Sequence, residues 1–416
     1  MNEIAIFTIA SGNYFAQVKT LLDSIYCVHN DVDLYYFLAD ELSVAITENS
    51  DNFNVICANQ LIIDNFESFS FKYNIIEFNT ALKPFCFENL INTKQYKKII
   101  YFDPDIFVFN KLYYIFDLLN NYSILLTPHV GDANFATTNF INLEFLFLKY
   151  GIYNLGFIAI SINSDSEKLI KWWKKRCYDN CYILKNEVTF VDQKWIDFVP
   201  SLFDNVFVIR NLGCNMAYWN IHERILSENF KVNDTFDLLF FHFSGFVLDN
   251  PIKITSSSVI RYTLEQRTDL VPIFNIYRKK ILENLYYNSN IPEYKYSHFK
   301  NGIKITDYHR SIYQYLQEIF PKPFDVNKKS YFHFVKKRKL LRHFCLPIPD
   351  FNTEMWLGNK HKSLNIRFLI SFFRFLEFVL GSVKFYGLIN KSKNFLNYIN
   401  SNTFLLKFNK NTFNKL

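Results

Sequence analysis

Short apolar runs alternate with helical patterns over the first 250 residues of the chain. Helical spacing of apolar side chains predicts a helix over 14–25. A second helix is expected over 164–179, opened by Ser164 with Glu167 three residues on, as in a capping box. Strands that alternate with helices indicate an α/β fold with a mostly parallel sheet flanked by helices. The runs predicted to be strands are 4–10, 33–40, 97–103, 122–128, 155–161, 205–211 and 238–243.

The pattern changes after about residue 250, where strands become scarce. Helical spacing over 271–287 and 308–319 predicts a smaller helical lobe behind the α/β body. The longest apolar segment, 366–389, is interrupted by charged side chains, so we expect no membrane-spanning helix. The chain starts without a basic region ahead of its apolar run, which predicts a buried strand rather than a signal peptide.

Composition excludes several classes of protein. Half of the 416 residues are hydrophobic and a fifth are charged, so the chain can form a packed core and is not expected to be disordered. Only ten residues are glycine, which excludes collagen-like chains. Seven scattered cysteines imply no disulfide framework and fit a reducing cytoplasm. The glycine-rich fingerprints of dinucleotide-binding and P-loop proteins do not occur in the sequence.

Charge is divided unevenly along the chain. The net charge is +7, but residues 321–416 hold 18 lysines and arginines against four acidic residues, so a mildly acidic body precedes a basic tail. Within the tail, a cationic run at 336–339 precedes 366–389, whose apolar face is wider than its polar stripe. This pattern favours a helix in the interface of an anionic membrane, and a helix docked on the body is the alternative. Long aliphatic runs between the basic residues disfavour nucleic acid as the partner.

The sharpest chemical feature is Asp103-Pro104-Asp105, at the end of the apolar run 97–103. Ligands of parallel sheets bind beyond the carboxyl ends of strands. Two carboxylates joined there by a rigid proline can present oxygens to Mg²⁺ or Mn²⁺ together with a substrate diphosphate. A solvated turn is the alternative, because Asp-Pro-Asp is also good turn chemistry.

Two other predicted strands carry polar residues at their ends. His242 lies in the run 238–243 and would complete a mixed oxygen and nitrogen site that suits Mn²⁺, with a hydrogen-bonded core histidine as the alternative. Gly156 would let the backbone approach a ligand, and Asn154 offers both a donor and an acceptor. An ordinary turn into a strand explains Asn154 and Gly156 equally well.

Two further segments combine polar and aromatic residues. Asp192 and Gln193 lie near the start of a short predicted helix, where Asp192 could be an N-cap. The segment 211–224 holds flat rings and amides that suit a carbohydrate or a nucleobase, and a loop of packed aromatics is the alternative. Acceptor pockets come from variable loops, here expected at 128–150 and 211–224. The candidate acceptor-side residues of the second loop are Tyr218, Trp219, Asn220 and His222.

The order of these motifs resembles that of a known family. A strand-loop-helix start, apolar residues into Asp-x-Asp, Asn-x-Gly, Asp-Gln and His-x-x-Gly are similar to the motifs of retaining nucleotide-sugar glycosyltransferases of family 8. This is the glycogenin and bacterial lipopolysaccharide galactosyltransferase type, and the resemblance covers about residues 1–250. The segments 81–91 and 211–224 resemble those of bacterial surface-polysaccharide glycosyltransferases. The resemblance implies a GT-A type, Rossmann-like sheet followed by a C-terminal helical region.

The resemblance also implies residue roles. Asp103, Asp105 and His242 would bind Mn²⁺ or Mg²⁺. The family's lysine after His-x-x-Gly contacts the diphosphate, whereas here it is displaced to Lys253 and the tryptophan that follows it is missing. The residues implied around the sugar and its reacting carbon are Asn154, Asp192 and Gln193. The residues implied on the donor side are Thr8, Ala10, Asn13, Lys83, Asp103, Gly156, Gly245 and Lys253.

The expected function is transfer of a sugar from a nucleoside-diphosphate sugar, by default UDP-linked, to a glycan or lipid-linked glycan of surface polysaccharide or lipopolysaccharide. Retention is expected because Gln193 is a poor nucleophile, which favours a front-side route. We expect a catalytic domain at 1–250, an acceptor-side helical lobe at 251–330 and a basic tail at 331–416. The protein is expected in the cytoplasm, peripheral on the inner face of the membrane. A haloacid dehalogenase-like phosphatase and a non-catalytic sugar- or partner-binding protein are the alternatives.

Overall fold

The computed structural model describes residues 2–132, 143–183, 188–257 and 262–337. Contacts divide the chain into two compact units, the first made of residues 1–304 and 317–325 and the second of 305–316 and 326–416. Within the described residues, no helix is both long and apolar enough to cross a membrane.

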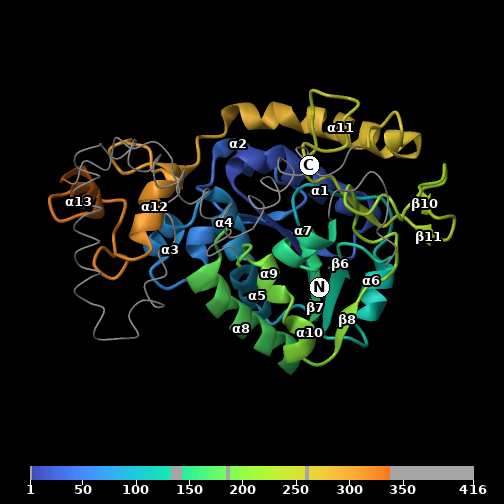
Figure 1. The fold of residues 1–416 in the computed structure, drawn as a ribbon, viewed down its shortest axis with the longest axis horizontal. Helices are drawn as coiled ribbons and strands as arrows, with labels where there is room; N and C mark the ends of the chain where they lie inside the picture. Colours follow the sequence, from blue (N-terminus) through green and yellow to red (C-terminus); the bar gives the residue numbers. More distant parts are fainter. Residues whose placement is uncertain (1, 133–142, 184–187, 258–261, 338–416) are drawn as a thin grey trace, which may run out of the picture. The chain divides into compact units, whose positions relative to one another are not determined.

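The first unit is built on a seven-stranded sheet with the order β3-β2-β1-β4-β7-β6-β8. Figure 1 labels β6, β7 and β8 of this sheet among the surrounding helices. All neighbouring strands are parallel except at β7, which runs antiparallel to both β4 and β6. The mostly parallel sheet predicted from the sequence is therefore confirmed. The strands are β1 (Ile4–Ala10), β2 (Asp33–Leu38), β3 (Asn54–Cys57), β4 (Lys98–Phe102), β6 (Ile124–Pro128), β7 (Tyr153–Ser161) and β8 (Val206–Val208).

Two small sheets accompany the large one. A three-stranded sheet has the order β5-β12-β9, and a two-stranded sheet pairs β10 with β11. The apolar run 238–243 thus forms a strand as predicted, but that strand, β12, lies in the small sheet. The strands are β5 (Ile106–Val108), β9 (Met216–Ala217), β10 (Lys231–Val232), β11 (Phe236–Asp237) and β12 (Phe240–His242).

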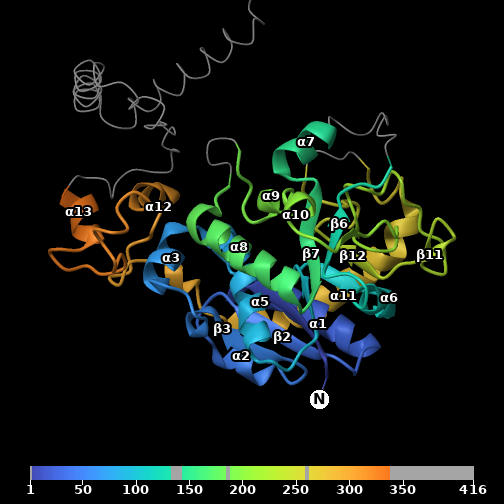
Figure 2. The same cartoon turned by 90° about the horizontal axis from the view of Figure 1, so that it is seen from below.

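The helices of the first unit cover both faces of the large sheet (Figure 2). They are α1 (Phe15–Val28), α2 (Val44–Glu48), α3 (Phe66–Lys72), α4 (Ile75–Ala81), α5 (Lys83–Asn92), α6 (Tyr113–Leu118), α7 (Leu143–Tyr150), α8 (Ser164–Asn180), α9 (Gln193–Ile196), α10 (Val199–Leu202) and α11 (Val271–Leu285). The second unit holds α12 (Asp307–Tyr313) and α13 (Tyr331–Lys337).

Side chains alternate between the two faces of β1, and each face packs on different helices. Ile6 belongs to a buried cluster with apolar residues of α1 and α6. Phe7, on the other face, meets Phe87 of α5 edge to face, and Phe87 in turn lies against Trp173 of α8. The large sheet is thus buried on both sides, which explains why its central strands read as continuous apolar runs.

The helix α11 packs beneath the small sheet. Its buried residues Ile273, Phe274 and Tyr277 share a hydrophobic cluster with Phe241 and Phe243 around the end of β12. Phe243 and Tyr277 stack with their ring centres 3.9 Å apart. This helix therefore belongs to the unit that carries the sheets, and the division of function among 1–250, 251–330 and 331–416 stays a prediction.

Two local expectations were wrong. Ser164 does not cap α8, because the side-chain oxygen of Asn163 accepts hydrogen bonds from the backbone N–H groups of Asp165 and Ser166. An asparagine one residue earlier is an equally good N-cap, which the Ser-x-x-Glu pattern concealed. The helix expected over 308–319 is α12, which ends at Tyr313.

The second unit is described only in part. Within it, the Tyr331 hydroxyl donates to the backbone oxygen of His309, and the rings of Tyr313 and Tyr331 lie 5.1 Å apart. The interfacial helix predicted over 366–389 lies outside the described residues, as do the last two residues of the cationic run 336–339.

Candidate active site

The two aspartates of the Asp-x-Asp motif lie in the turn between β4 and β5. The backbone N–H of Asp103 donates to the Gly156 oxygen on β7 at 2.8 Å, which extends the β4–β7 pairing by one residue. The backbone N–H of Ile106 then donates to the backbone oxygen of Asp103 at 3.1 Å, which closes the turn. Both carboxylates remain about a quarter exposed, so a ligand can reach them.

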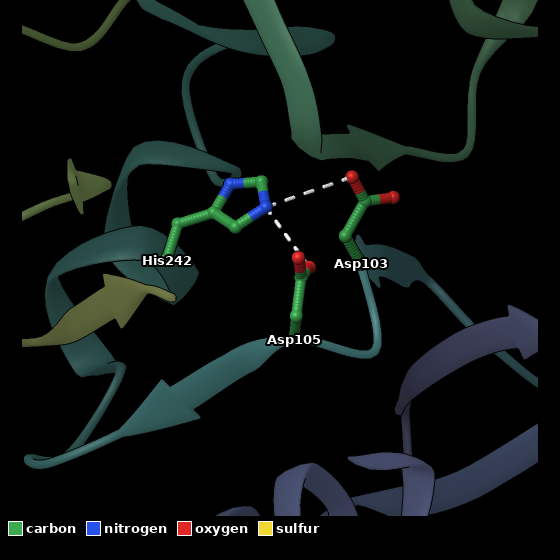
Figure 3. Close-up of side chains that lie close together, drawn as sticks. All are labelled: Asp103, Asp105 and His242. Atoms are coloured by element: carbon green, nitrogen blue, oxygen red, sulfur yellow. Dashed lines mark ion pairs between the residues drawn. The ribbon is translucent and has the colours of Figure 1, made fainter. Parts of the chain in front are cut away.

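Strand pairing brings His242 to the aspartates. The antiparallel register of β12 with β5 places His242 opposite Ile106. The backbone N–H of Phe243 donates to the backbone oxygen of Asp105 at 2.8 Å. The imidazole Nε2 lies 2.9 Å from Asp105 Oδ1 and 3.9 Å from Asp103 Oδ2 (Figure 3). One donor atom from each residue lies within 4.8 Å of the other two, as a shared cation requires.

Gly156 is the residue that makes room for the imidazole. A Cβ at this position would lie 2.4 Å from His242 Cε1 and 2.6 Å from its Nδ1. The imidazole therefore rests directly on the backbone of β7, which only glycine permits. The glycine predicted to admit a ligand close to the backbone thus admits a side chain of the protein itself.

The charges of this cluster support one another. Burial alone would lower the pKa of His242, but the carboxylates of Asp105 and Asp103 outweigh it and raise that pKa. Burial would raise the pKa of Asp105, and the imidazolium outweighs it and lowers that pKa. Two carboxylates and one imidazole form a mixed oxygen and nitrogen donor set, which fits Mn²⁺ and also accommodates Mg²⁺.

A buried lysine links this cluster to Asp192. Lys83 Nζ lies 2.9 Å from Asp192 Oδ2 and 3.5 Å from Asp103 Oδ1, and it donates to the Leu155 oxygen at 2.9 Å. Burial would lower the pKa of Lys83, but Asp103 and Asp192 outweigh it and raise that pKa. Burial raises the pKa of Asp192 to about 6, although Lys83 opposes the shift. Asp192 precedes α9 without capping it, because its carboxylate is directed to the lysine.

The amides of Gln193 and Asn154 are engaged by protein groups. Gln193 accepts from the Leu155 N–H at 2.9 Å and donates to the Tyr150 oxygen at 3.0 Å, so it braces the start of β7. Asn154 Oδ1 accepts from the Gly156 N–H at 3.1 Å and from Asn215 Nδ2 at 2.9 Å. Asn154 contacts His242 directly, whereas Gln193 reaches only the backbone next to it, and the roles expected for both at the sugar stay predictions.

The four acceptor-side candidates lie at different places in the same loop. Trp219 meets the His242 ring edge to face at 5.1 Å, and Tyr218 meets Trp219 at 4.9 Å. Asn220 is fully buried and joins three backbone groups, Ala217 N–H and the oxygens of Asn215 and His129. The loop thus combines aromatic residues beside the cluster with a structural amide.

His222, the fourth candidate, is half-buried, and burial lowers its pKa. The next residue was not predicted from the sequence: the Glu223 carboxylate accepts from the backbone N–H groups of Gly131 and Asp132. This side chain holds the segment that follows β6 against the loop after β9.

The remaining donor-side candidates surround the ends of β1 and β12. Thr8 is buried in β1, and its hydroxyl has no hydrogen-bond partner within the described part of the chain. Ala10 is the last residue of β1, and Asn13 is exposed in the turn that follows. Gly245 has a positive φ of 67°, and a Cβ there would meet Thr255 Oγ1 at 2.7 Å. Lys253 is exposed and forms an isolated bridge with Thr263.

Comparison with known proteins gives relatives without an established role. No protein-family model matches the chain. It is similar to two Bacillus subtilis (strain 168) proteins, YfnF and YfnD, both named as uncharacterized. The identity to YfnF is 28% over 210 residues, 49% of this chain and 67% of YfnF. The identity to YfnD is 24% over 261 residues, 60% of this chain and 79% of YfnD.

In structure the chain resembles several glycosyltransferases. The galactosyltransferase LgtC, in complex with donor and acceptor sugar analogs, matches at a TM-score of 0.41 and 15% identity over 70% of this chain and 98% of LgtC. The glycosyltransferase GlyE of Streptococcus pneumoniae TIGR4 matches at a TM-score of 0.39 and 16% identity over 72% of this chain and 67% of GlyE. The bifunctional WbbM matches at a TM-score of 0.38 and 13% identity over 70% of this chain and half of WbbM.

Two tyrosines of the site were missed from the sequence. The Tyr101 hydroxyl donates to Asp103 Oδ1, and its ring lies under Lys83 Nζ at 4.6 Å. Tyr14 is 44% exposed, and its pKa is raised by burial and then by the charges of Asp105 and Asp103. In a chain with 27 tyrosines, no sequence signal distinguishes these two, although Tyr101 lies near the end of β4 and Tyr14 lies in the turn after β1.

Proposed function

We propose that the chain is a metal-dependent glycosyltransferase that moves a sugar from a nucleoside-diphosphate sugar, with UDP as the default, to a glycan. The observation that carries this proposal is the convergence of Asp103, Asp105 and His242 at the carboxyl end of β4, beside the buried pair of Lys83 and Asp192. Carboxylate and imidazole donors at the strand ends of a parallel sheet suit a cation that grips a diphosphate.

The chain's own residues bind and orient the donor in this proposal. Mn²⁺ or Mg²⁺ held by the three side chains would supply Lewis-acid neutralisation of the charge on the departing diphosphate, worth several kcal/mol. Asp103 and Asp105 would hold the cation through carboxylate oxygens, and His242 would hold it through deprotonated Nε2. Lys83 forms ion pairs with Asp103 and Asp192 from inside the protein. The ends of β1 and β12, with Thr8, Ala10, Asn13, Gly245 and Lys253, form the nucleotide side.

Retention of configuration is part of the proposal. Asn154, Asp192 and Gln193 would surround the sugar ring near its reacting carbon. Gln193 is a weak nucleophile, so a front-side route is favoured over a covalent sugar-enzyme intermediate, which needs a carboxylate opposite the leaving group. NMR of the anomeric proton of the product is expected to show the donor's configuration, and an inverted product would reject this part.

The acceptor is proposed to be a glycan or lipid-linked glycan of surface polysaccharide or lipopolysaccharide. Tyr218 and Trp219 offer aromatic faces beside the cluster, and flat apolar rings suit sugar binding. We further propose that the basic tail holds the protein on the inner face of an anionic membrane, where a lipid-linked acceptor is found. The cysteine content supports a cytoplasmic location.

Two other functions receive less support. Haloacid dehalogenase-like phosphatases carry the apolar Asp-x-Asp motif in their first strand, whereas here it follows β4. A non-catalytic binding protein has no need of a lysine ion-paired with Asp103 and an imidazole ion-paired with Asp105 at the same turn.

The experiment is a screen of sugar nucleotides for Mn²⁺-dependent hydrolysis, followed by Asp103→Asn and Asp105→Asn. Each change removes a charged ligand atom while keeping the side-chain shape, so we expect turnover to fall at least a hundredfold with the fold intact. The matched control is Asp51→Asn, an exposed aspartate in the turn before β3, which should leave turnover unchanged. Full activity of both site variants would contradict the proposal, and so would metal-independent donor binding in calorimetry.

A further inference from the structure

The second nitrogen of His242 faces Asn154. While Nε2 points to the aspartates, Nδ1 lies 3.3 Å from Asn154 Oδ1. Both residues are more than nine-tenths buried, so water does not compete for this contact. The partner of the second nitrogen decides which nitrogen of a neutral imidazole keeps the proton.

The orientation of the Asn154 amide follows from its neighbours. The Gly156 N–H and Asn215 Nδ2 both donate to one atom of Asn154, which must therefore be the oxygen. The amide nitrogen then faces His129 Nε2 at 3.4 Å and can only donate to it. The oxygen that faces His242 Nδ1 can only accept, so Nδ1 must carry a proton.

His129 is held in the form that this arrangement needs. Its Nδ1 lies 3.1 Å from the backbone oxygen of Ile152, an acceptor, so Nδ1 carries the proton and Nε2 is free to accept from Asn154. The ring stacks on Phe147 at 4.8 Å and meets Trp219 edge to face at 5.4 Å. Burial also lowers the pKa of His129 to about 4, so that its ring stays neutral.

We propose that His129 and Asn154 form a positioning pair that keeps the proton of His242 on Nδ1 and leaves the lone pair of Nε2 for the cation. When the imidazolium loses one proton, Asp105, 2.9 Å from Nε2, would otherwise retain the remaining proton on Nε2, which blocks coordination. Groups behind a metal-binding histidine orient it in this way, and their loss typically weakens metal binding ten- to a hundredfold. The inference rests on the proposed metal site.

The test compares three variants with the wild-type protein. His129→Phe keeps the ring packing but removes the acceptor for Asn154. His129→Gln carries both a donor and an acceptor and is the conservative rescue. Asn154→Ala removes the acceptor of Nδ1 directly and creates no steric conflict, which keeps the test open if His129→Phe does not fold. Circular dichroism and thermal unfolding establish that each variant is folded.

Two measurements are made on each folded protein. The first is NMR of histidine-labelled, metal-free protein, in which the ring N–H proton on Nδ1 of His242 is identified by its loss in His242→Gln. We expect slow exchange of this proton in the wild type and in His129→Gln, and at least tenfold faster exchange in His129→Phe and Asn154→Ala. The second is Mn²⁺ affinity by calorimetry, expected to weaken ten- to a hundredfold in the same two variants.

The outcomes separate this inference from the proposed function. If His129→Phe and Asn154→Ala keep both the slow proton exchange and the wild-type Mn²⁺ affinity, the positioning pair is refuted. If the proton exchange changes as expected but the wild-type protein binds no Mn²⁺, the positioning pair stands and the proposed metal dependence fails.

Discussion

Five charged side chains meet at the candidate site, and their charges nearly balance. Asp103, Asp105 and Asp192 carry one negative charge each, against the positive charges of Lys83 and protonated His242. A divalent cation that displaces the imidazole proton would bring the sum to zero. In a partly buried cluster such neutrality lowers the electrostatic cost of the bound state, which supports the proposed cation site.

The buried ion pair of Lys83 and Asp192 is predicted to stabilise the folded protein. Lys83→Met leaves the Asp192 carboxylate buried without its cation, and removal of one partner of a buried pair costs about 3–5 kcal/mol. We expect the free energy of unfolding, measured by urea titration, to fall by this order. Lys83→Arg retains the charge and should lose much less. An unfolding midpoint for Lys83→Met equal to that of the wild type would contradict this interpretation.

His129 is predicted to make the fold sensitive to acid. Because its pKa is lowered from 6.5 to about 4, the unfolded chain takes up a proton between these values that the folded protein does not. The stability that this residue contributes is therefore complete above pH 6.5 and is lost as the pH falls towards 4.

The measurement is the free energy of unfolding at pH 7 and pH 5 for the wild type and His129→Gln. The wild type is expected to lose about 2 kcal/mol more than the variant between these pH values. The same loss in both proteins would show that other groups cause the acid sensitivity.

At the scale of elements, the site depends on strand register. β5 and β12 are three-residue strands, yet their pairing alone places His242 against Asp105. The sequence predicts the position of each aspartate, because an apolar strand ends there, but not this pairing. More than 130 residues separate the two strands, and neither has turn signals that connect it to the other. The residue type of His242 suggested a third ligand, and the resemblance to a family of known motif order strengthened that expectation.

Gly156→Ala is predicted to disrupt the site through β7. The added methyl would lie 2.4 Å from the His242 ring and displace it from the aspartates, so we expect Mn²⁺ binding to weaken at least tenfold. Calorimetry measures the affinity, and thermal unfolding reports any loss of stability.

The control for this change is Ile158→Val on the same strand. Loss of one buried methylene there should cost about 0.5–1.5 kcal/mol of stability and leave Mn²⁺ affinity unchanged. If Gly156→Ala binds Mn²⁺ like the wild type, the imidazole does not need the space above Gly156.

At the scale of the whole molecule, the sequence predicted the architecture better than the site. Alternating strands and helices gave the mostly parallel sheet, because buried parallel strands read as apolar runs. The antiparallel direction of β7 was not predictable, because an apolar run does not show whether its strand is parallel or antiparallel to its neighbours. The buried contacts of Lys83 and His129 were not predictable either. Lys83 donates to the backbone oxygen of Leu155, which lies more than 70 positions further along the chain. The contact of His129 depends on its ring reaching the backbone oxygen of Ile152.

The charge asymmetry of the whole chain predicts membrane binding. We expect the full chain to sediment with anionic vesicles, less so at high salt, because a basic segment is attracted to acidic lipids and salt screens the attraction. Removal of residues 338–416 takes away most of the basic tail and should abolish sedimentation. Neutral vesicles are the control. Undiminished sedimentation of the shortened chain with anionic vesicles would refute the role given to the tail.

The reversed direction of β7 has a consequence for how this scaffold can diversify. The first residues of β7 lie near the carboxyl end of β4, next to the turn that carries Asp103. Ser161 and the start of α8 lie at the other end of the strands. Exchange of α7, just ahead of β7, would leave the turn that carries Asp103 in place, provided that the new segment keeps two contacts: the Phe147 ring on His129, and the Tyr150 backbone oxygen that accepts from Gln193. With these contacts kept, grafting at this one position would change the proposed acceptor specificity and leave the proposed donor site in place.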